Sequence, residues 1–179
     1  MPELPEVETM CRGIAPIVGR RLSRILLPEC AYRPISIRPA VDEMNKLVAG
    51  QVVDRISRLG KRVLVHVAGQ ALILQPKMSG LVLLESPPDP DHNRLQLDFV
   101  GQPTLRLLFW DRRGLGTVGM LPEGAVHERI VAGRLGPDAL EVSLDDFHRR
   151  LHATGRPIKV ALLDQKLIAG VGNLYASEM

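Results

Sequence analysis

The hydrophobic positions of the chain follow a helical spacing at both ends and a strand spacing in between. Apolar residues three and four apart predict a helix over residues 5–18, and the acidic Glu6 and Glu8 suit its first turn. Short runs rich in Leu and β-branched residues, bounded by Gly, Pro, Asp or Asn, predict seven strands: 22–27, 52–58, 62–67, 71–74, 81–84, 94–100 and 104–109. The middle of the chain is therefore predicted to be a sheet.

The pattern returns to helical spacing after about residue 122. Ser143, three residues before Asp146, predicts a capped helix start, and Pro157 suits the opening of a second helix. The glycines of 168–172 interrupt that second helix, and a third is predicted to begin at Asn173. The chain is thus predicted to be α+β, with a sheet domain at 1–122 and a helical domain at 123–179. Because the third helix still runs at the last residue, we expect the helical domain to be incomplete.

Composition adds a weak indication about partners. The 179 residues are 45% hydrophobic, so a packed core is expected. Lys and Arg outnumber Asp and Glu by 23 to 20, which suits a polyanionic partner, although clustered arginines are equally typical of a solvated face. Only 3% of the residues are aromatic, which argues against a single-strand binder that works by base stacking.

Two cysteines limit the metal and redox chemistry. Cys11 and Cys30 form no C-x-x-C pair, so these residues predict no zinc site of the finger or ribbon type, and no other metal site. A disulfide between them is possible but nothing suggests one. With no apolar signal segment and no run of membrane-spanning length, a cytosolic location is expected.

The N-terminus offers candidate covalent chemistry. A small second residue, Pro2, is compatible with removal of Met1, which would leave a secondary amine with a pKa of roughly 8. Such an amine can attack an aldehyde-level carbon to form an iminium, and the adjacent Glu3 could move the proton that elimination requires. Many proteins begin Met-Pro without any such role, so the dipeptide alone favours the ordinary interpretation.

A second candidate lies near the other end of the chain. In residues 162–173 two glycines precede a predicted helix that Asn173 is positioned to cap. Free N–H groups at a helix N-terminus can bind an anion such as phosphate. Helix capping explains the same residues without any ligand, and is favoured on this segment alone.

Six motifs in one order narrow these alternatives. They are P-E-L-P-E-V-E-T at 2–9, G-K at 60–61, M-S-G at 78–80, D-R-R-G-L-G at 111–116, L-G-P-D-A-L at 135–140 and L-L-D-Q-K-L-I-A-G-V-G-N-L-Y-A-S-E at 162–178. In this spacing the chain resembles the formamidopyrimidine-DNA glycosylases of the Fpg/Nei family, over nearly its whole length. The opening motif favours this branch over endonuclease VIII. The resemblance implies an N-terminal helix with a two-layer antiparallel β-sandwich, followed by the start of a helix–two-turns–helix domain.

The resemblance also implies catalytic positions. Pro2 matches the family's nucleophile, and Glu3 matches the carboxylate that handles protons on the opened sugar. Glu6 matches a residue that helps hold the N-terminus in place. Lys61 matches the lysine that contacts phosphate beside the lesion and assists base release.

Further positions match residues that bind DNA. Asn173 matches an asparagine that binds backbone phosphate, and His92 also falls at a DNA-binding position. Three residues match side chains that enter the duplex when the damaged base is flipped out: Met78, Arg113 and Leu115. Core packing is the ordinary interpretation of Met78 and Leu115.

The chain departs from the family pattern at four positions near these residues. Leu115 stands where the family usually has an aromatic wedge, and Gly114 where it has a basic residue. Gln75 and Lys77 replace a histidine and a small residue before M-S-G. These changes bear on lesion search and selectivity rather than on catalysis.

The implied function is a monomeric bacterial enzyme that acts on damaged double-stranded DNA in the cytoplasm. It would remove 8-oxoguanine and formamidopyrimidines and cleave the strand by β,δ-elimination. No cofactor is expected within these residues, because the family's structural zinc lies in a four-cysteine finger that they do not include. A damaged-DNA-binding fragment with weak or no activity is the alternative. An RNA- or ribosome-associated basic protein would explain the charge but none of the motifs.

Overall fold

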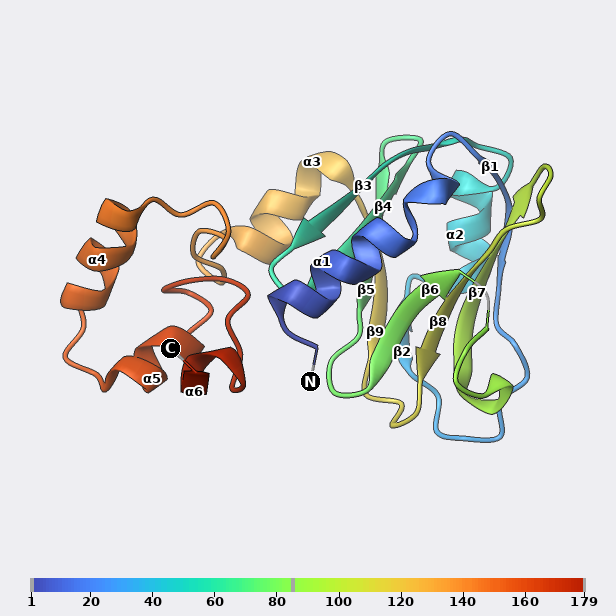
Figure 1. Ribbon diagram of the computed structural model, residues 1–179. Helices are drawn as coiled ribbons and strands as arrows, with labels where there is room; N and C mark the ends of the chain where they lie inside the picture. Colours follow the sequence, from blue (N-terminus) through green and yellow to red (C-terminus); the bar gives the residue numbers. More distant parts are fainter. Residues whose placement is uncertain (1, 85, 179) are drawn as a thin grey trace.

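Two β-sheets packed face to face form the larger part of the molecule (Figure 1). The computed structural model describes residues 2–84 and 86–178. One sheet, sheet A, has the order β1 (Arg21–Leu26), β7 (Asn93–Val100), β8 (Arg106–Asp111), β6 (Gly80–Leu84). The other, sheet B, has the order β2 (Ser36–Arg38), β9 (Thr117–Pro122), β5 (Gln70–Gln75), β4 (Arg62–Val67), β3 (Val53–Leu59). Neighbouring strands are antiparallel except β2 and β9, which are parallel.

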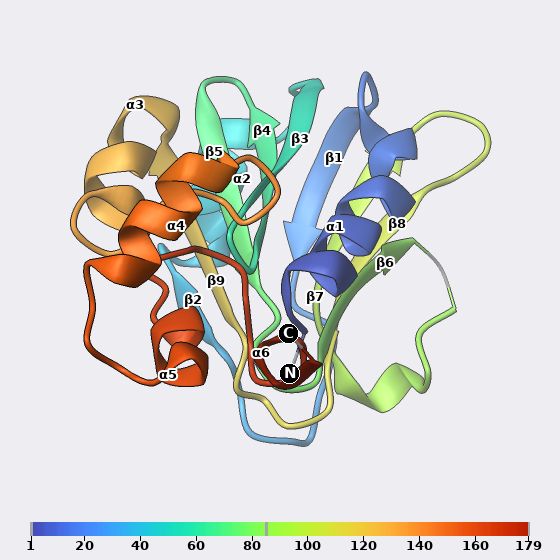
Figure 2. The same ribbon diagram turned by 60° about the vertical axis from the view of Figure 1, so that its left-hand side comes forward.

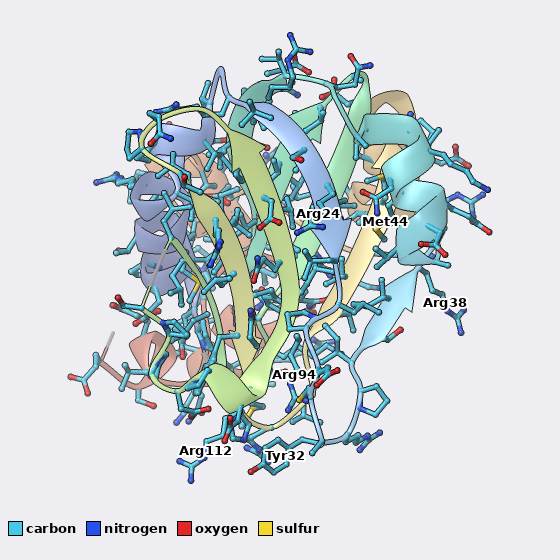
Figure 3. The ribbon with its side chains drawn as sticks, turned by 90° about the vertical axis from the view of Figure 1, so that its right-hand side faces the viewer. Arg24, Tyr32, Arg38, Met44, Arg94 and Arg112 are labelled. Atoms are coloured by element: carbon cyan, nitrogen blue, oxygen red, sulfur yellow. The ribbon has the colours of Figure 1, made fainter. Side chains whose placement is uncertain are left out.

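The core lies between the two sheets because strand alternation sends every second side chain inward. On β4 the inward residues Val63, Val65 and Val67 are fully buried, as is Phe109 on the facing β8. Helix α1 (Leu4–Gly13) packs against β6, β3 and β4, and α2 (Val41–Val48) packs against β1. Figure 3 shows Met44 of α2 directed toward the strands. The two helices thus cover apolar surface that the sheets leave open.

The seven predicted strands are all present, and the α+β class is confirmed. Sequence patterns missed β2, β9 and α2. β2 has only three residues and forms through its pairing with β9, which is distant in sequence. The predicted helix at 5–18 ends earlier, since α1 stops at Gly13 and a 3₁₀ turn, η1 (Ala15–Ile17), follows. Pro16 lies in that turn, and a proline cannot continue an α-helical hydrogen-bond ladder.

Short helices make up the remainder. A one-turn 3₁₀ helix, η2 (Pro90–His92), precedes β7, and the segment after β9 contains α3 (Glu123–Val126), a π turn η3 (His127–Val131), α4 (Leu144–His152), α5 (Ile158–Leu163) and α6 (Tyr175–Glu178). The hydroxyl of Ser143 accepts the N–H of Asp146 at 3.2 Å, which confirms the predicted start of α4. Figures 1 and 2 show α4 to α6 beside the sandwich.

Candidate active site

The N-terminal segment is bound to the last helical segment through Glu3. This residue is 3% exposed, and its carboxylate accepts N–H groups from Gly172 at 2.8 Å, Leu174 at 2.8 Å and Tyr175 at 3.3 Å. The N–H of Leu4 adds a bond to the carbonyl of Gly170 at 3.1 Å. The expectation that Asn173 caps the last helix is therefore wrong: the acceptor of the N–H groups there is the carboxylate of Glu3, 172 residues before Tyr175 in the sequence.

The two glycines before α6 have a steric function in this contact. A Cβ on Gly172 would lie 2.2 Å from Cδ of Glu3, and one on Gly170 would lie 2.4 Å from Cδ1 of Leu4. Gly170 also has a φ of +109°, a conformation that L side chains rarely adopt. Thus the glycines admit the N-terminus, and the N–H groups that could have bound an external anion are bonded to Glu3.

Pro2 is half-buried immediately before this contact. The backbone of Glu3 is also bonded within the start of α1: its N–H donates to the carboxylate of Glu6 at 2.9 Å, and its carbonyl accepts the N–H of Val7 at 3.0 Å. The first turn of α1 and the helical segment therefore both fix the backbone next to Pro2.

Lys61 comes to the same corner from the turn between β3 and β4. Burial lowers the pKa of Lys61, and the nearby carboxylate of Glu3 partly offsets that shift. The preceding Gly60 has a φ of +55°, and a Cβ placed on it would lie 3.7 Å from Cβ of Ala169. The structure thus brings together Pro2, Glu3 and Lys61, which are far apart in the sequence.

Arg58 has a buried side chain near the site, and the sequence pattern does not single it out, because an arginine in a basic segment is ordinarily interpreted as part of a solvated face. Its side chain is only 7% exposed. It donates to Glu8 at 3.0 Å and to both carboxylate oxygens of Asp138 at 2.5 and 2.8 Å. Hydrogen bonding to Asp138 raises the pKa of Arg58, and the Arg58 guanidinium lowers the pKa of Glu8. These bonds connect α1, β3 and the segment that leads to the helices.

Asp111 is a second missed residue, and it joins two of the sequence motifs. It is fully buried, and its carboxylate accepts Oγ–H of Ser79 at 2.7 Å and the N–H groups of Arg113 at 3.2 Å and Gly116 at 2.6 Å. Ser79 belongs to M-S-G, and the other two belong to D-R-R-G-L-G. One carboxylate thus positions both turns, although the motif alone assigned it no role.

The side chains on these turns are accessible. Met78 is 44% exposed and Arg113 is exposed, while Leu115 is half-buried. Core packing therefore does not explain Met78. Asn173, on the segment that contacts Glu3, is exposed as well.

His92 has a different environment. Its Nδ1 lies 2.7 Å from a carboxylate oxygen of Asp89, and its ring stacks on Tyr32 with the centroids 4.3 Å apart. Figure 3 shows Tyr32 at the edge of the molecule beside Arg94 and Arg112. His92 is thus held in an aromatic and basic cluster at the end of sheet A.

The residues described here do not fit a structural zinc ion. Within 2–84 and 86–178 no three His, Cys, Asp or Glu side chains gather closely enough to hold a metal. Cys11 and Cys30 are both free, and burial raises the pKa of Cys11 to about 11. In the same residues, every helix is too short or too polar to cross a bilayer.

Two family profiles match the chain. The formamidopyrimidine-DNA glycosylase N-terminal domain matches residues 1–118, and the formamidopyrimidine-DNA glycosylase H2TH domain matches residues 135–179. A formamidopyrimidine-DNA glycosylase of Moorella thermoacetica is 35% identical over 184 residues, which cover 100% of this chain and 66% of that protein. One of Streptococcus pneumoniae is 32% identical over 182 residues, covering 100% and 65%. The chain therefore spans just under two thirds of the length of these relatives.

Solved structures show the same similarity. Lactococcus lactis Fpg (MutM) in complex with DNA containing N7-benzyl-Fapy-dG superposes with a TM-score of 0.83 at 30% identity, covering 99% of this chain and 65% of that one. The Lactococcus lactis Fpg complex with DNA containing an abasic site gives a TM-score of 0.82 at 29% identity, covering 98% and 65%.

Replacing Arg58 by Met should destabilise the protein by about 3–5 kcal/mol, because it leaves the largely buried carboxylate of Asp138 without its cation and Glu8 with only the exposed Arg12. Urea unfolding at neutral pH measures this. Arg55→Gln is the matched control, since Arg55 lies on the same strand with a side chain 54% exposed and pairs with Glu123. The control should cost at most about 1 kcal/mol. Equal losses in the two variants would contradict the assignment.

The Arg58–Glu8 pair should also make stability depend on pH. Because the folded pKa of Glu8 lies below its ordinary value of 4.5, the pair stabilises the fold above that value. This contribution is lost as the pH falls through the lowered pKa. Glu8→Gln should therefore be less stable than wild type at pH 7, and the difference should shrink in acid. A difference that grows on acidification would refute this.

Gly172→Ala should push the Glu3 carboxylate from its N–H donors and cost roughly 1–3 kcal/mol. Gly124→Ala is the control, since a Cβ there meets nothing within 4 Å, and it should leave stability unchanged or slightly higher. Thermal melts of both variants test the contact, and a Gly172→Ala protein as stable as wild type would disprove it.

Proposed function

Because the chain belongs to the formamidopyrimidine-DNA glycosylase family, we propose that it excises oxidised purines from duplex DNA and then cleaves the strand. The expected lesions are 8-oxoguanine and formamidopyrimidines. The observation that carries the proposal is the convergence of Pro2, Glu3 and Lys61 where the sandwich meets the helical segment.

In the proposed reaction the amine of Pro2, freed by removal of Met1, attacks C1′ of the damaged nucleotide. The N–C1′ bond forms as the glycosidic bond breaks, and the departing base takes a proton. Opening of the sugar ring moves a proton to O4′ and leaves an iminium. Loss of a proton from C2′ then expels the 3′ phosphate, and a second elimination expels the 5′ phosphate.

Glu3 and Lys61 suit the charges that this reaction creates. The carboxylate of Glu3 is fixed by three N–H groups directly after Pro2, so its negative charge would stabilise the iminium without rearrangement. Burial lowers the pKa of Lys61, which makes its ammonium a better proton donor toward the leaving base. Glu6, bonded to the N–H of Glu3, would hold the N-terminus in register.

Contacts with DNA would come from the turns around the site. Base flipping costs a few kcal/mol of stacking and pairing. Met78 and Leu115 would fill the space left by the flipped base, and Arg113 would pair with the orphaned partner. Asn173 and His92 would bind backbone phosphates. Asp111 supports this proposal because it holds the two inserting turns together.

A protein that binds damaged DNA without turnover is the alternative. An apolar hollow of about 400 Å³ between α1 and the helical segment favours it, because Leu140 and Leu144 on that segment are largely exposed. A helical segment that packs incompletely would hold the lesion less firmly over Pro2.

Borohydride reduction in the presence of an abasic-site duplex separates the two functions. The enzyme should give a covalent protein–DNA adduct that Pro2→Gly abolishes. Pro5→Ala is the matched control, since Pro5 lies in the same segment without the terminal amine, and it should keep the adduct. DNA binding without any adduct would establish the alternative. Mass spectrometry must find Met1 removed, because a retained Met1 blocks the amine and rules out the covalent mechanism.

A further inference from the structure

Four arginines line one hollow on the outer face of sheet B. The hollow has a volume of about 380 Å³, and its floor is formed by β2, β9, β5 and β4. Its arginines come from three separate parts of the chain: Arg38, Arg62, Arg129 and Arg134. Arg38 extends outward from β2 in Figure 3. The side chain of Arg134 donates to the carbonyl of Arg129, which keeps these two on one wall.

The arginines of this hollow have no acidic partner among the described residues. In the part of the chain that the structure describes, no acidic side chain lines it, and none of its four arginines has a carboxylate within 4 Å. Other arginines, such as Arg24 and Arg58, are paired in this way. Burial lowers the pKa of Arg62, as expected for a guanidinium that is desolvated without a counter-charge. Four like charges around one hollow repel each other, so an anion bound there would relieve the repulsion.

The hollow adjoins the proposed active site. Gln75 and Thr117 line it, and they are paired at the ends of β5 and β9. The M-S-G turn follows Gln75 within five residues, and the D-R-R-G-L-G turn ends directly before Thr117. Arg62 directly follows Lys61. From there the hollow extends to Arg129 and Arg134, in the segment that connects sandwich and helices.

Phosphodiester groups match this arrangement. The guanidinium fork binds phosphate oxygens in a bidentate manner, and arginines spread along one hollow can each neutralise a different phosphate. A single small anion could contact only some of the four arginines, because they come from β2, β4 and the segment after α3. A strand of DNA that passes the inserting turns carries a regular row of such phosphates.

We infer that this arginine hollow binds the sugar–phosphate backbone of the DNA duplex flanking the lesion. The inference rests on the proposed function for the identity of the DNA. It assigns Arg38, Arg129 and Arg134 to phosphate contacts that fix position and carry no sequence information.

The test uses the full chain and fluorescence anisotropy with a labelled duplex that contains a stable abasic-site analogue. Arg129→Gln/Arg134→Gln should weaken binding about tenfold at low salt. It should also reduce the slope of log K against log salt by about 2, since each phosphate contact releases close to one counterion. Arg38→Gln alone should reduce that slope by about 1. Arg62 is left intact because its partial burial makes a substitution harder to interpret.

The matched control is Arg20→Gln/Arg21→Gln, which removes the same charge at the start of β1, at the opposite end of the sandwich from the N-terminus (Figure 1). An unchanged slope in the hollow variant would overturn the inference, and so would an equal loss in the control. Borohydride trapping at saturating protein is run in parallel. If wild type forms the adduct but the hollow variant binds normally, only the hollow assignment fails. If the slope falls as expected but no adduct forms with wild type, the hollow stands and the catalytic proposal fails.

Discussion

The docking of one carboxylate onto the backbone of a distant helix determines the geometry of the candidate site. Glu3 is almost fully buried, and burial of an ionised carboxylate is costly unless hydrogen bonds replace its water. The N–H groups of Gly172, Leu174 and Tyr175 do so, and the start of α6 in turn gains the acceptor that a helix N-terminus needs. Because Glu3 directly follows Pro2, the bonds that join the N-terminal segment to the helical segment also fix the backbone next to Pro2.

Polar contacts, rather than a shared core, set how the helical segment sits on the sandwich. The segment has an apolar cluster of its own around Leu162, Ile168 and Val171, separate from the main core. Across the boundary the carboxylate of Glu3 accepts N–H groups at the start of α6, the N–H of Leu4 donates to the carbonyl of Gly170, and Arg58 pairs with Asp138. Asp138 also forms a backbone bridge with Ala169. Arg58, through Asp138, therefore helps to position the segment that contains Gly170 and Gly172. Removal of the Arg58 charge should therefore alter the position of the Pro2 backbone, although the two residues are not in contact.

Local patterns predicted what local physics determines. Short runs rich in Leu and β-branched residues predicted seven of the strands β1 to β9, and residues three apart predicted the Ser143 cap. The same reasoning failed where a partner is remote in sequence. The position of Asn173 directly before the last helix predicts it as the cap, whereas Glu3 provides the acceptor. The sequence does not reveal the importance of Arg58 and Asp111 for the same reason, because hydrophobic spacing does not show that a charged side chain is buried or which remote residue it pairs with. The resemblance to the family predicts Pro2, Glu3 and Lys61 as site residues, but not the contacts that bring them together.

The turn between β3 and β4 connects the three regions that the proposals concern. Gly60 faces Ala169 of the helical segment, Lys61 lies close enough to Glu3 for its pKa to be affected, and Arg62 lines the arginine hollow. Successive residues entering a strand point to opposite faces, so one chain reversal can serve both the reactive corner and the outer surface. A shift of one residue in the pairing of Leu59 with Arg62 would exchange the lysine and the arginine between these environments. The buried valines of β4 prevent such a shift, because it would also turn Val63 and Val65 out of the core. The packing of the sandwich therefore determines which basic side chain lies near Glu3 and which lines the arginine hollow.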